Sequence, residues 1–313
     1  MKSAGWYGTA VLTCCTVLAG AQSLAIAKKE ARSGRVDAAV TALKTIPRSA
    51  QGDALLCALY GSVGQYDQAV VACEAAAADE PSSSTYALAL ARAYGAKADH
   101  AGAITGLRLV GKIRSSFERA VTLDGNSVEA LSDLGQFYVE APGAVGGGLD
   151  RARALLPRLK PLSAARTLRL SAMIAAKSKD NEAAEQNYQS ELTIAHSPEA
   201  YVDLANFYRS RKDWDKAAAN AKAAITRDVA CGPDVLDAAG ILIALRRDLP
   251  AAQTALRCYL REPQAEVASY AKAYTLLGDS LRESGDAAGA RTAYQDALAL
   301  AQDYAPARQG LTR

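Results

Sequence analysis

Cysteine is the residue type in this sequence with the plainest covalent chemistry. Two of the six cysteines lie close to the N-terminus and four lie in the body of the chain, at Cys57, Cys73, Cys231 and Cys258. An even number of cysteines in an exported chain permits disulfides. We expect Cys57 to pair with Cys73, and Cys231 with Cys258, because the members of each pair fall within one predicted helical hairpin. The alternative is four small buried apolar side chains, which free cysteines often are.

Metal-binding and acid–base chemistry has few candidates. The sequence has two histidines, His100 and His196, and no C-x-x-C motif. It therefore predicts neither a structural zinc site nor a haem attachment site. Asp213 and Asp215 flank Trp214, where carboxylates typically cap a helix. We predict no catalytic residue, no cofactor and no metal, with an unrecognised carboxylate-based enzyme as the alternative.

The elements that carry these residues form internal repeats. Residues 50–83 contain Tyr60, a tight turn at 64–67, Ala69 and a closing Pro81. The aromatic or apolar position of Tyr60 recurs at Tyr94, Tyr138, Ala175, Tyr208, Ile243 and Leu281. Residues 26–49 have the features of an opening unit. A repeated pair of short helices cannot bury its apolar face alone, so neighbouring pairs must stack.

This pattern resembles the tetratricopeptide repeat, a 34-residue helix–turn–helix unit. The resemblance implies an all-α fold, a right-handed superhelical solenoid of about seven to eight hairpins. The predicted units are 26–49, 50–83, 84–127, 128–164, 165–197, 198–231, 233–268 and 271–304, followed by a capping segment at 305–313. The family also implies a protein or peptide partner, bound without catalysis.

Two insertions interrupt the repeat period. Lys97–Val110 lengthens the third unit, and apolar residues at helical spacing within it predict additional helix. Ala141–Gly148 is rich in glycine and precedes a predicted helix at Leu149. No Lys-Ser or Lys-Thr follows these glycines, so a flexible connector is favoured over a phosphate-binding loop. Insertions of this kind often customise binding in repeat arrays.

Polar side chains on the predicted first helices point into the concave groove of such a solenoid. Some members of the family hold the carboxylates of a peptide C-terminus with a Lys/Asn/Arg cluster. Arg169, Asn206 and Arg209 resemble part of that cluster, and Lys177 is a further groove candidate. Arginine and asparagine can form charge-assisted hydrogen bonds to a carboxylate. The alternative is a set of ordinary solvated charges.

Charge argues against a nucleic-acid partner. The 36 basic and 33 acidic residues leave a net charge of +3. The basic residues are interspersed with acidic ones, whereas nucleic-acid-binding domains cluster them on one face. We therefore expect no nucleic-acid partner.

The order of residues at the N-terminus predicts export. Lys2 precedes an apolar stretch at 9–20, and small residues follow at 19–21 and 23–25. This order predicts a secretory signal peptide at 1–25, ahead of a repeat domain at 26–313. Cleavage would give a periplasmic or extracellular protein with no membrane span in the mature chain. The alternative is an uncleaved N-terminal anchor.

The sequence therefore predicts an exported scaffold whose concave groove binds a peptide or protein segment. The alternative is an assembly role within an envelope complex, with contacts made through the convex face or the two insertions.

Overall fold

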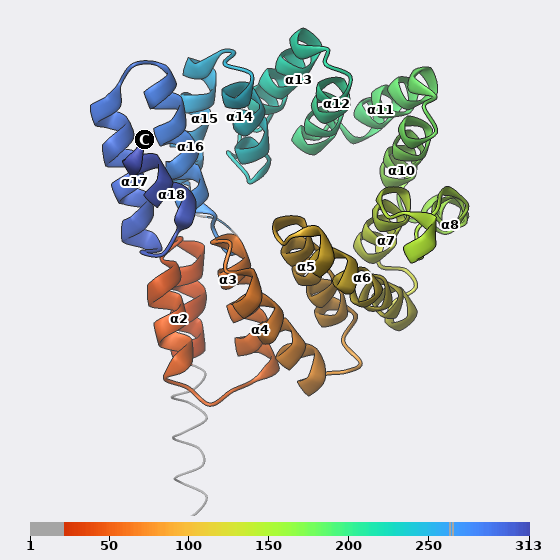
Figure 1. Ribbon diagram of the computed structural model, residues 1–313, viewed down its shortest axis with the longest axis horizontal. Coiled ribbons are helices and arrows are strands. Elements are labelled where there is room, and N and C mark those ends of the chain that lie inside the picture. Colours follow the sequence, from red (N-terminus) through yellow and green to blue (C-terminus); the bar gives the residue numbers. More distant parts are fainter. Residues whose placement is uncertain (1–21, 263, 265) are drawn as a thin grey trace, which may run out of the picture.

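The computed structural model describes every residue except 1–21, 263 and 265. The described residues form helices and connecting turns without a strand, and the helices stack as consecutive antiparallel hairpins along a curved path (Figure 1). The predicted all-α solenoid is thus confirmed. The predicted signal peptide lies almost entirely outside the described residues.

Eight helical hairpins and a final helix make up the described part of the solenoid. The first hairpin joins the helical residues 22–32 to α2 (Val36–Lys44). The other regular hairpins pair α3 (Ala50–Ser62) with α4 (Tyr66–Asp79), α5 (Ser84–His100) with α6 (Ala103–Leu123), α10 (Ala164–Lys177) with α11 (Asn181–Ala195), α12 (Pro198–Ser210) with α13 (Trp214–Arg227), α14 (Asp234–Ala244) with α15 (Leu249–Arg261), and α16 (Tyr270–Glu283) with α17 (Ala287–Leu300).

The remaining hairpin is irregular in its second half. Helix α7 (Val128–Glu140) is followed by a 3₁₀ turn (Gly143–Val145) and two short helices, α8 (Leu149–Arg153) and α9 (Leu156–Leu159). The predicted glycine-rich insertion therefore forms the connector between α7 and α8. Helix α18 (Ala305–Thr312) closes the chain at the predicted capping segment.

Helix starts follow a simple rule in the sequence. Five first helices begin after a serine whose hydroxyl accepts a backbone N–H three residues on: Ser49, Ser83, Ser127, Ser163 and Ser197. Three second helices begin after an aspartate that does the same, at Asp180, Asp213 and Asp286. Each cap stabilises its helix by about 1 kcal/mol. Asp213 thus caps a helix as the sequence predicts.

Consecutive hairpins are joined by a recurring contact. The Tyr138 hydroxyl donates to Glu118 at 2.9 Å, and the Tyr208 hydroxyl donates to Glu185 at 2.6 Å. In both cases the tyrosine lies on a first helix and the carboxylate on the preceding second helix. Small residues allow the close approach of helices: a Cβ added at Gly135 would lie 2.7 Å from the side chain of Leu170.

The first hairpin packs against the C-terminal repeats and closes the solenoid into a ring (Figure 1). The amide of Ala268 donates to the carbonyl of Ala31 at 3.0 Å, and the amide of Gln302 donates to the Asp37 carboxylate at 2.9 Å. Residues 22–44 share one buried core with residues 202–307. We call the contact between the first hairpin and residues 268–302 the seam. The repeat pattern does not predict it.

Candidate functional site

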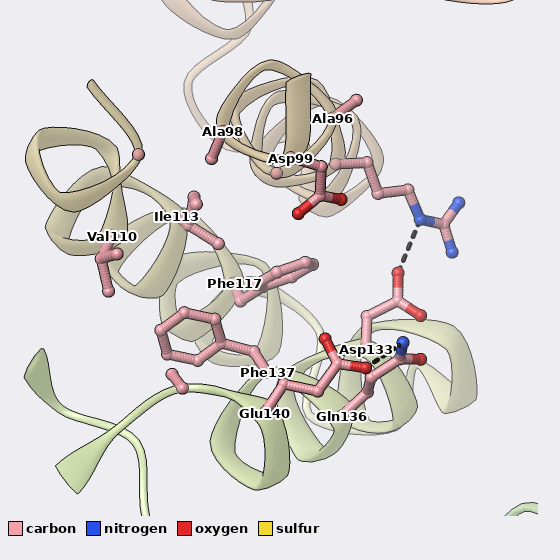
Figure 2. Close-up of a pocket in the computed structure, with 14 residues that line it drawn as sticks. Ala96, Ala98, Asp99, Val110, Ile113, Phe117, Asp133, Gln136, Phe137 and Glu140 are labelled. Atoms are coloured by element: carbon pink, nitrogen blue, oxygen red, sulfur yellow. Dashed lines mark hydrogen bonds and ion pairs between the residues drawn. The ribbon is translucent and has the colours of Figure 1, made fainter. Parts of the chain in front are cut away.

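The first helices of the hairpins face the centre of the ring, as α5 and α14 do in Figure 1. Here a cleft with a volume of about 550 Å³ opens between α5, α6 and α7. We call it the α5–α7 cleft. Figure 2 shows its apolar wall, formed by Val110, Ile113, Phe117 and Phe137. The rings of Phe117 and Phe137 pack with their centroids 6.2 Å apart.

The Lys97–Val110 insertion gives this cleft its depth. It lengthens both helices of its hairpin, so that α5 has 17 residues and α6 has 21. The α3–α4 hairpin, in comparison, has helices of 13 and 14 residues. Small side chains leave space along the elongated helices, because Gly95, Ala98 and Gly106 all line the cleft. The insertion is therefore a signal for this site in the sequence, although it does not single out the lining residues.

The mouth of the cleft is acidic. Asp133 pairs with Arg92 at 2.6 Å, and Glu140 accepts a hydrogen bond from Gln136 at 2.8 Å (Figure 2). Asp99 is exposed at the same mouth and makes no ion pair among the described residues. Three carboxylates against one guanidinium give the opening a net negative charge.

Two large apolar side chains stand exposed at the tip of the elongated hairpin. Ile104 is 72% exposed and Leu107 is 63% exposed. They flank Gly106, which lines the cleft. Neither side chain lines the cleft, so they form a separate exposed apolar surface near the start of α6, of the kind at which other molecules often dock.

The predicted groove residues lie elsewhere, on α10 and α12. Arg169 is largely buried and forms two hydrogen bonds with Asp203, at 2.6 and 3.3 Å. Asn206 is half-buried and Arg209 is exposed. Lys177 is exposed at the end of α10, and its ammonium group lies 3.4 Å from the carbonyl of Glu140. Arg169 already has a carboxylate partner within the chain, which sets it apart from the other three candidates.

The Arg169–Asp203 contact belongs to a series of ion pairs between successive first helices. Related pairs join Arg92 to Asp133, Arg166 to Glu199, and Lys272 to Asp237. Partners lie 33 to 41 residues apart, about one repeat. Much of the groove charge therefore connects neighbouring repeats.

Glu191 is the most deeply buried carboxylate near these pairs. It is 3% exposed, and its Oε2 atom has no hydrogen-bond partner among the described residues. Burial, together with the charge of Asp203, raises the pKa of Glu191 to about 8. The side chain is therefore largely protonated at neutral pH, because an unpaired buried carboxylate is costly.

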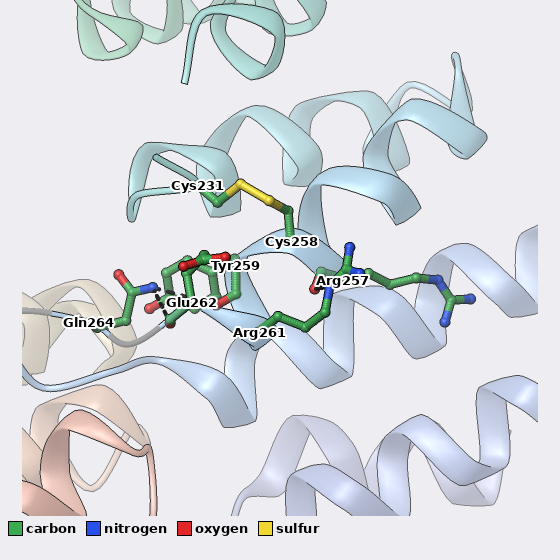
Figure 3. Close-up of a disulfide and its surroundings, with 7 residues drawn as sticks. All are labelled: Cys231, Arg257, Cys258, Tyr259, Arg261, Glu262 and Gln264. Carbon is green, nitrogen blue, oxygen red and sulfur yellow. Dashed lines mark hydrogen bonds between the residues drawn. A yellow bond between two sulfur atoms is a disulfide. The ribbon is translucent and has the colours of Figure 1, made fainter. Parts of the chain in front are cut away.

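Both expected cysteine pairs form disulfides in the structure. Cys57 and Cys73 join α3 to α4, with Cα atoms 5.2 Å apart. Cys231 and Cys258 join the segment before α14 to α15, with Cα atoms 5.7 Å apart (Figure 3). The first bond fixes the two helices of the α3–α4 hairpin together, and the second ties the connector between α13 and α14 to α15.

The other chemistry-bearing residues have structural contacts. His100 stacks on Tyr66 with ring centroids 4.3 Å apart, and His196 ends α11 with a positive φ of 48°. Among residues 22–313, apart from 263 and 265, no group of three or more His, Cys, Asp or Glu side chains could hold a metal ion. Within that same part of the chain no helix is both long and apolar enough to cross a membrane.

Comparison with known proteins gives the following likenesses. Residues 271–304 match the family model of the tetratricopeptide repeat. No curated protein matches the sequence. A thermophilic tetratricopeptide-repeat protein of Thermus thermophilus is 19% identical, with 68% of this chain and 100% of that chain covered and a TM-score of 0.46.

Two further solved structures resemble the chain. YrrB, a tetratricopeptide-repeat protein with an unusual peptide-binding site, is 12% identical over 63% of this chain and 98% of that chain, with a TM-score of 0.42. PilW, a type IV pilus biogenesis factor, is 15% identical over 85% of this chain and 99% of that chain, with a TM-score of 0.41.

Proposed function

We propose that this chain, a member of the tetratricopeptide-repeat superfamily, is an exported scaffold that binds a segment of a partner protein in the α5–α7 cleft. Solenoids of this superfamily are scaffolds for protein–protein interaction. The proposal adds the place of binding, the chemistry of the bound segment and the compartment. It contains no catalytic step.

The α5–α7 cleft carries the proposal. Its apolar wall at Phe117 and Phe137 suits a large apolar side chain. Its acidic mouth at Asp99 and Glu140 suits a neighbouring lysine or arginine. A bound segment would therefore present an apolar residue beside a basic one. Because the cleft is preformed between packed helices, little conformational entropy of the scaffold is lost on binding.

Selection from a displayed peptide library tests this site. Leucine at Gly95 or Gly106 fills the cleft, and leucine favours a helix over glycine by roughly 0.5–1 kcal/mol. A Cβ at Gly95 meets nothing within 4 Å, and one at Gly106 lies 3.5 Å from the nearest atom. Gly111→Leu is the matched control, because Gly111 lies on the same helix as Gly106, has open space and does not line the cleft.

We expect the unmodified chain to enrich peptides with adjacent apolar and basic residues. Gly95→Leu and Gly106→Leu should lose these peptides, and Gly111→Leu should keep them. Equal binding by all three variants would contradict the cleft as the binding site.

An assembly role is the second candidate, favoured by the exposed tip. Ile104 and Leu107 are exposed apolar side chains that do not line the cleft. Loss of partner binding by Ile104→Ser/Leu107→Ser, with unchanged binding by Gly106→Leu, would support docking on the tip instead.

Export is supported by the order of residues at the N-terminus and by the two disulfides, which persist in oxidising compartments. The described part of the first helix runs from 22 to 32, so cleavage before Gln22 would keep all of that part, whereas cleavage before Ile26 would remove about one turn of it. Mass spectrometry of the protein from its native host decides the question. A mature chain that begins at Gln22 or Ile26 agrees with export by cleavage, and an intact Met1 contradicts it.

A further inference from the structure

A second cleft lies at the seam, apart from the site described above. It has a volume of about 740 Å³ and lies between the first hairpin and the segment that connects α15 to α16. We call it the seam cleft. Five basic side chains line it: Lys28, Lys29, Arg32, Arg35 and Arg261. The ring of Tyr270 forms part of its wall.

The positive charge of the seam cleft is almost uncompensated. Arg35 pairs with Glu30. Lys28, Lys29, Arg32 and Arg261 make no ion pair with any described carboxylate, in contrast to the paired cations along the centre of the ring. The acidic residues that follow Arg261 do not line the cleft.

The local charge is large compared with that of the whole protein. The five lining cations together with Glu30, which pairs with Arg35 but does not line the cleft, carry a net charge of +4, whereas the whole chain carries +3. The rest of the chain therefore has a net charge of −1. The sequence alone does not reveal all of this local charge, because Arg261 lies more than two hundred residues from the other four cations.

Ring closure adds Arg261 to the four cations that the first hairpin already carries. The hydrogen bond between the Ala268 amide and the Ala31 carbonyl places the segment after α15 beside the first hairpin. Gly34 lies against Tyr270, since a Cβ added there would be 2.7 Å from that side chain. Like charges brought together without counter-charges repel each other, so a bound anion would relieve this repulsion.

The arrangement of the cations favours an extended anion over a compact one. Lys28 and Arg32 are four residues apart on one helix, which places them about 6 Å apart along its axis. Alternate residues of an extended peptide are spaced by roughly 6.6 Å. Carboxylates at every second position of a peptide therefore match this row of cations. We propose that the seam cleft binds an acidic, extended segment of a partner protein.

Fluorescence anisotropy with a labelled Glu-Ser-Glu-Ser-Glu-Ser peptide tests the proposal on the chain from Gln22 onward, in 100 mM NaCl. Lys28→Gln/Arg32→Gln removes two cleft cations, both exposed. Lys160→Gln/Arg291→Gln is the matched control, since it removes two exposed cations that make no ion pair with any described carboxylate and lie outside the cleft. Circular dichroism verifies that each variant is folded.

We expect the cleft variant to bind the peptide at least tenfold more weakly, and the control variant to stay within twofold of the unmodified chain. Glu30→Gln should bind several-fold more tightly, because it frees Arg35 and removes the one carboxylate. Equal weakening in both double variants would overturn the proposal, since net charge alone would then explain binding. Absence of peptide binding would also overturn it.

Two further arms distinguish other anions. Inorganic phosphate at 10 mM should displace the peptide only weakly, and vesicles of phosphatidylglycerol should bind less well than the peptide. Strong displacement by phosphate, or preferential binding to the vesicles, would overturn the assignment of an acidic peptide as the ligand.

Discussion

The closure of the ring predicts that a substitution at Gly34 weakens the seam. This residue occupies the turn of the first hairpin with φ of 66°, and an added Cβ would lie 2.7–2.8 Å from three atoms of Tyr270 across the seam. Gly64 and Gly285 occupy the same turn position in other hairpins, with φ of 74° and 88°. There an added Cβ meets nothing closer than 3.8 Å. The three glycines therefore share one backbone strain but differ in the contact across the seam.

Alanine at each position should separate the two effects. The left-handed conformation costs an alanine about 1–2 kcal/mol at all three sites. Overpacking against Tyr270 adds about 1–3 kcal/mol at Gly34 alone. We expect Gly34→Ala to weaken the docking of the first hairpin by that additional amount, whereas Gly64→Ala and Gly285→Ala should leave the seam intact.

Hydrogen exchange measured by mass spectrometry is the assay, because repeat arrays unfold in parts and a global unfolding curve averages over them. The amides of Ala268 and Gln302 donate hydrogen bonds across the seam. Peptides that contain these amides should exchange about 5- to 150-fold faster in Gly34→Ala than in the unmodified chain. Small-angle scattering should show a larger radius of gyration as the ring opens. Identical exchange in all three variants would refute the closure of the ring by the first hairpin.

Three further predictions concern stability. Arg169→Ala leaves a buried carboxylate without its cation, and it should lower the free energy of unfolding measured in urea by about 3–5 kcal/mol. Arg92→Ala breaks an exposed pair and should lower that free energy by less than about 1 kcal/mol. Equal losses of stability in the two variants would contradict the difference in burial. Because the folded-state pKa of Glu191 is raised to about 8, stability should fall as pH rises from about 4.5 to 8, and Glu191→Gln should reduce this fall in urea midpoints measured across that range. Cys57→Ser/Cys73→Ser should lower the free energy of unfolding by about 3 kcal/mol, as expected for a closed loop of this size. Reductant should lower the melting temperature of the unmodified chain more than that of the variant.

Local chemistry explains why so much of the fold is predictable. Each regular hairpin has a turn of small or polar residues, and many helices begin after a serine or aspartate cap, so the sequence marks helix boundaries directly. A turn joins α3 to α4 as expected, but it lies at 63–65, because α4 already begins at Tyr66. The insertion at Lys97–Val110 is predicted to be helical, and it extends both α5 and α6.

The candidate site is only partly predictable. The groove residues are predicted from their position on the first helices, and this criterion cannot distinguish a free cation from a paired one. Arg169 and Asp203 are 34 residues apart, and Arg166 and Glu199 are 33 apart. Opposite charges separated by one repeat occupy equivalent positions on the first helices of neighbouring hairpins. In the sequence, this spacing is what indicates that Arg169 already has a carboxylate partner. The α5–α7 cleft depends on how far two helices extend beyond their neighbour, which is a property of the packed array.

The closed ring follows from the whole array rather than from any one unit. A terminal repeat usually has a polar outer face, because no neighbour covers it. The first hairpin instead has the small residues Ala27, Ala31 and Gly34 at helical spacing, which suit the close approach of another element. This composition indicates that the first hairpin has a partner, but it does not identify the partner. The identity depends on the rotation accumulated over the successive hairpins, including the elongated α5–α6 pair, which together bring Tyr270 against Gly34. A change in the length of one hairpin in mid-array should therefore open the ring without altering a single residue of the seam.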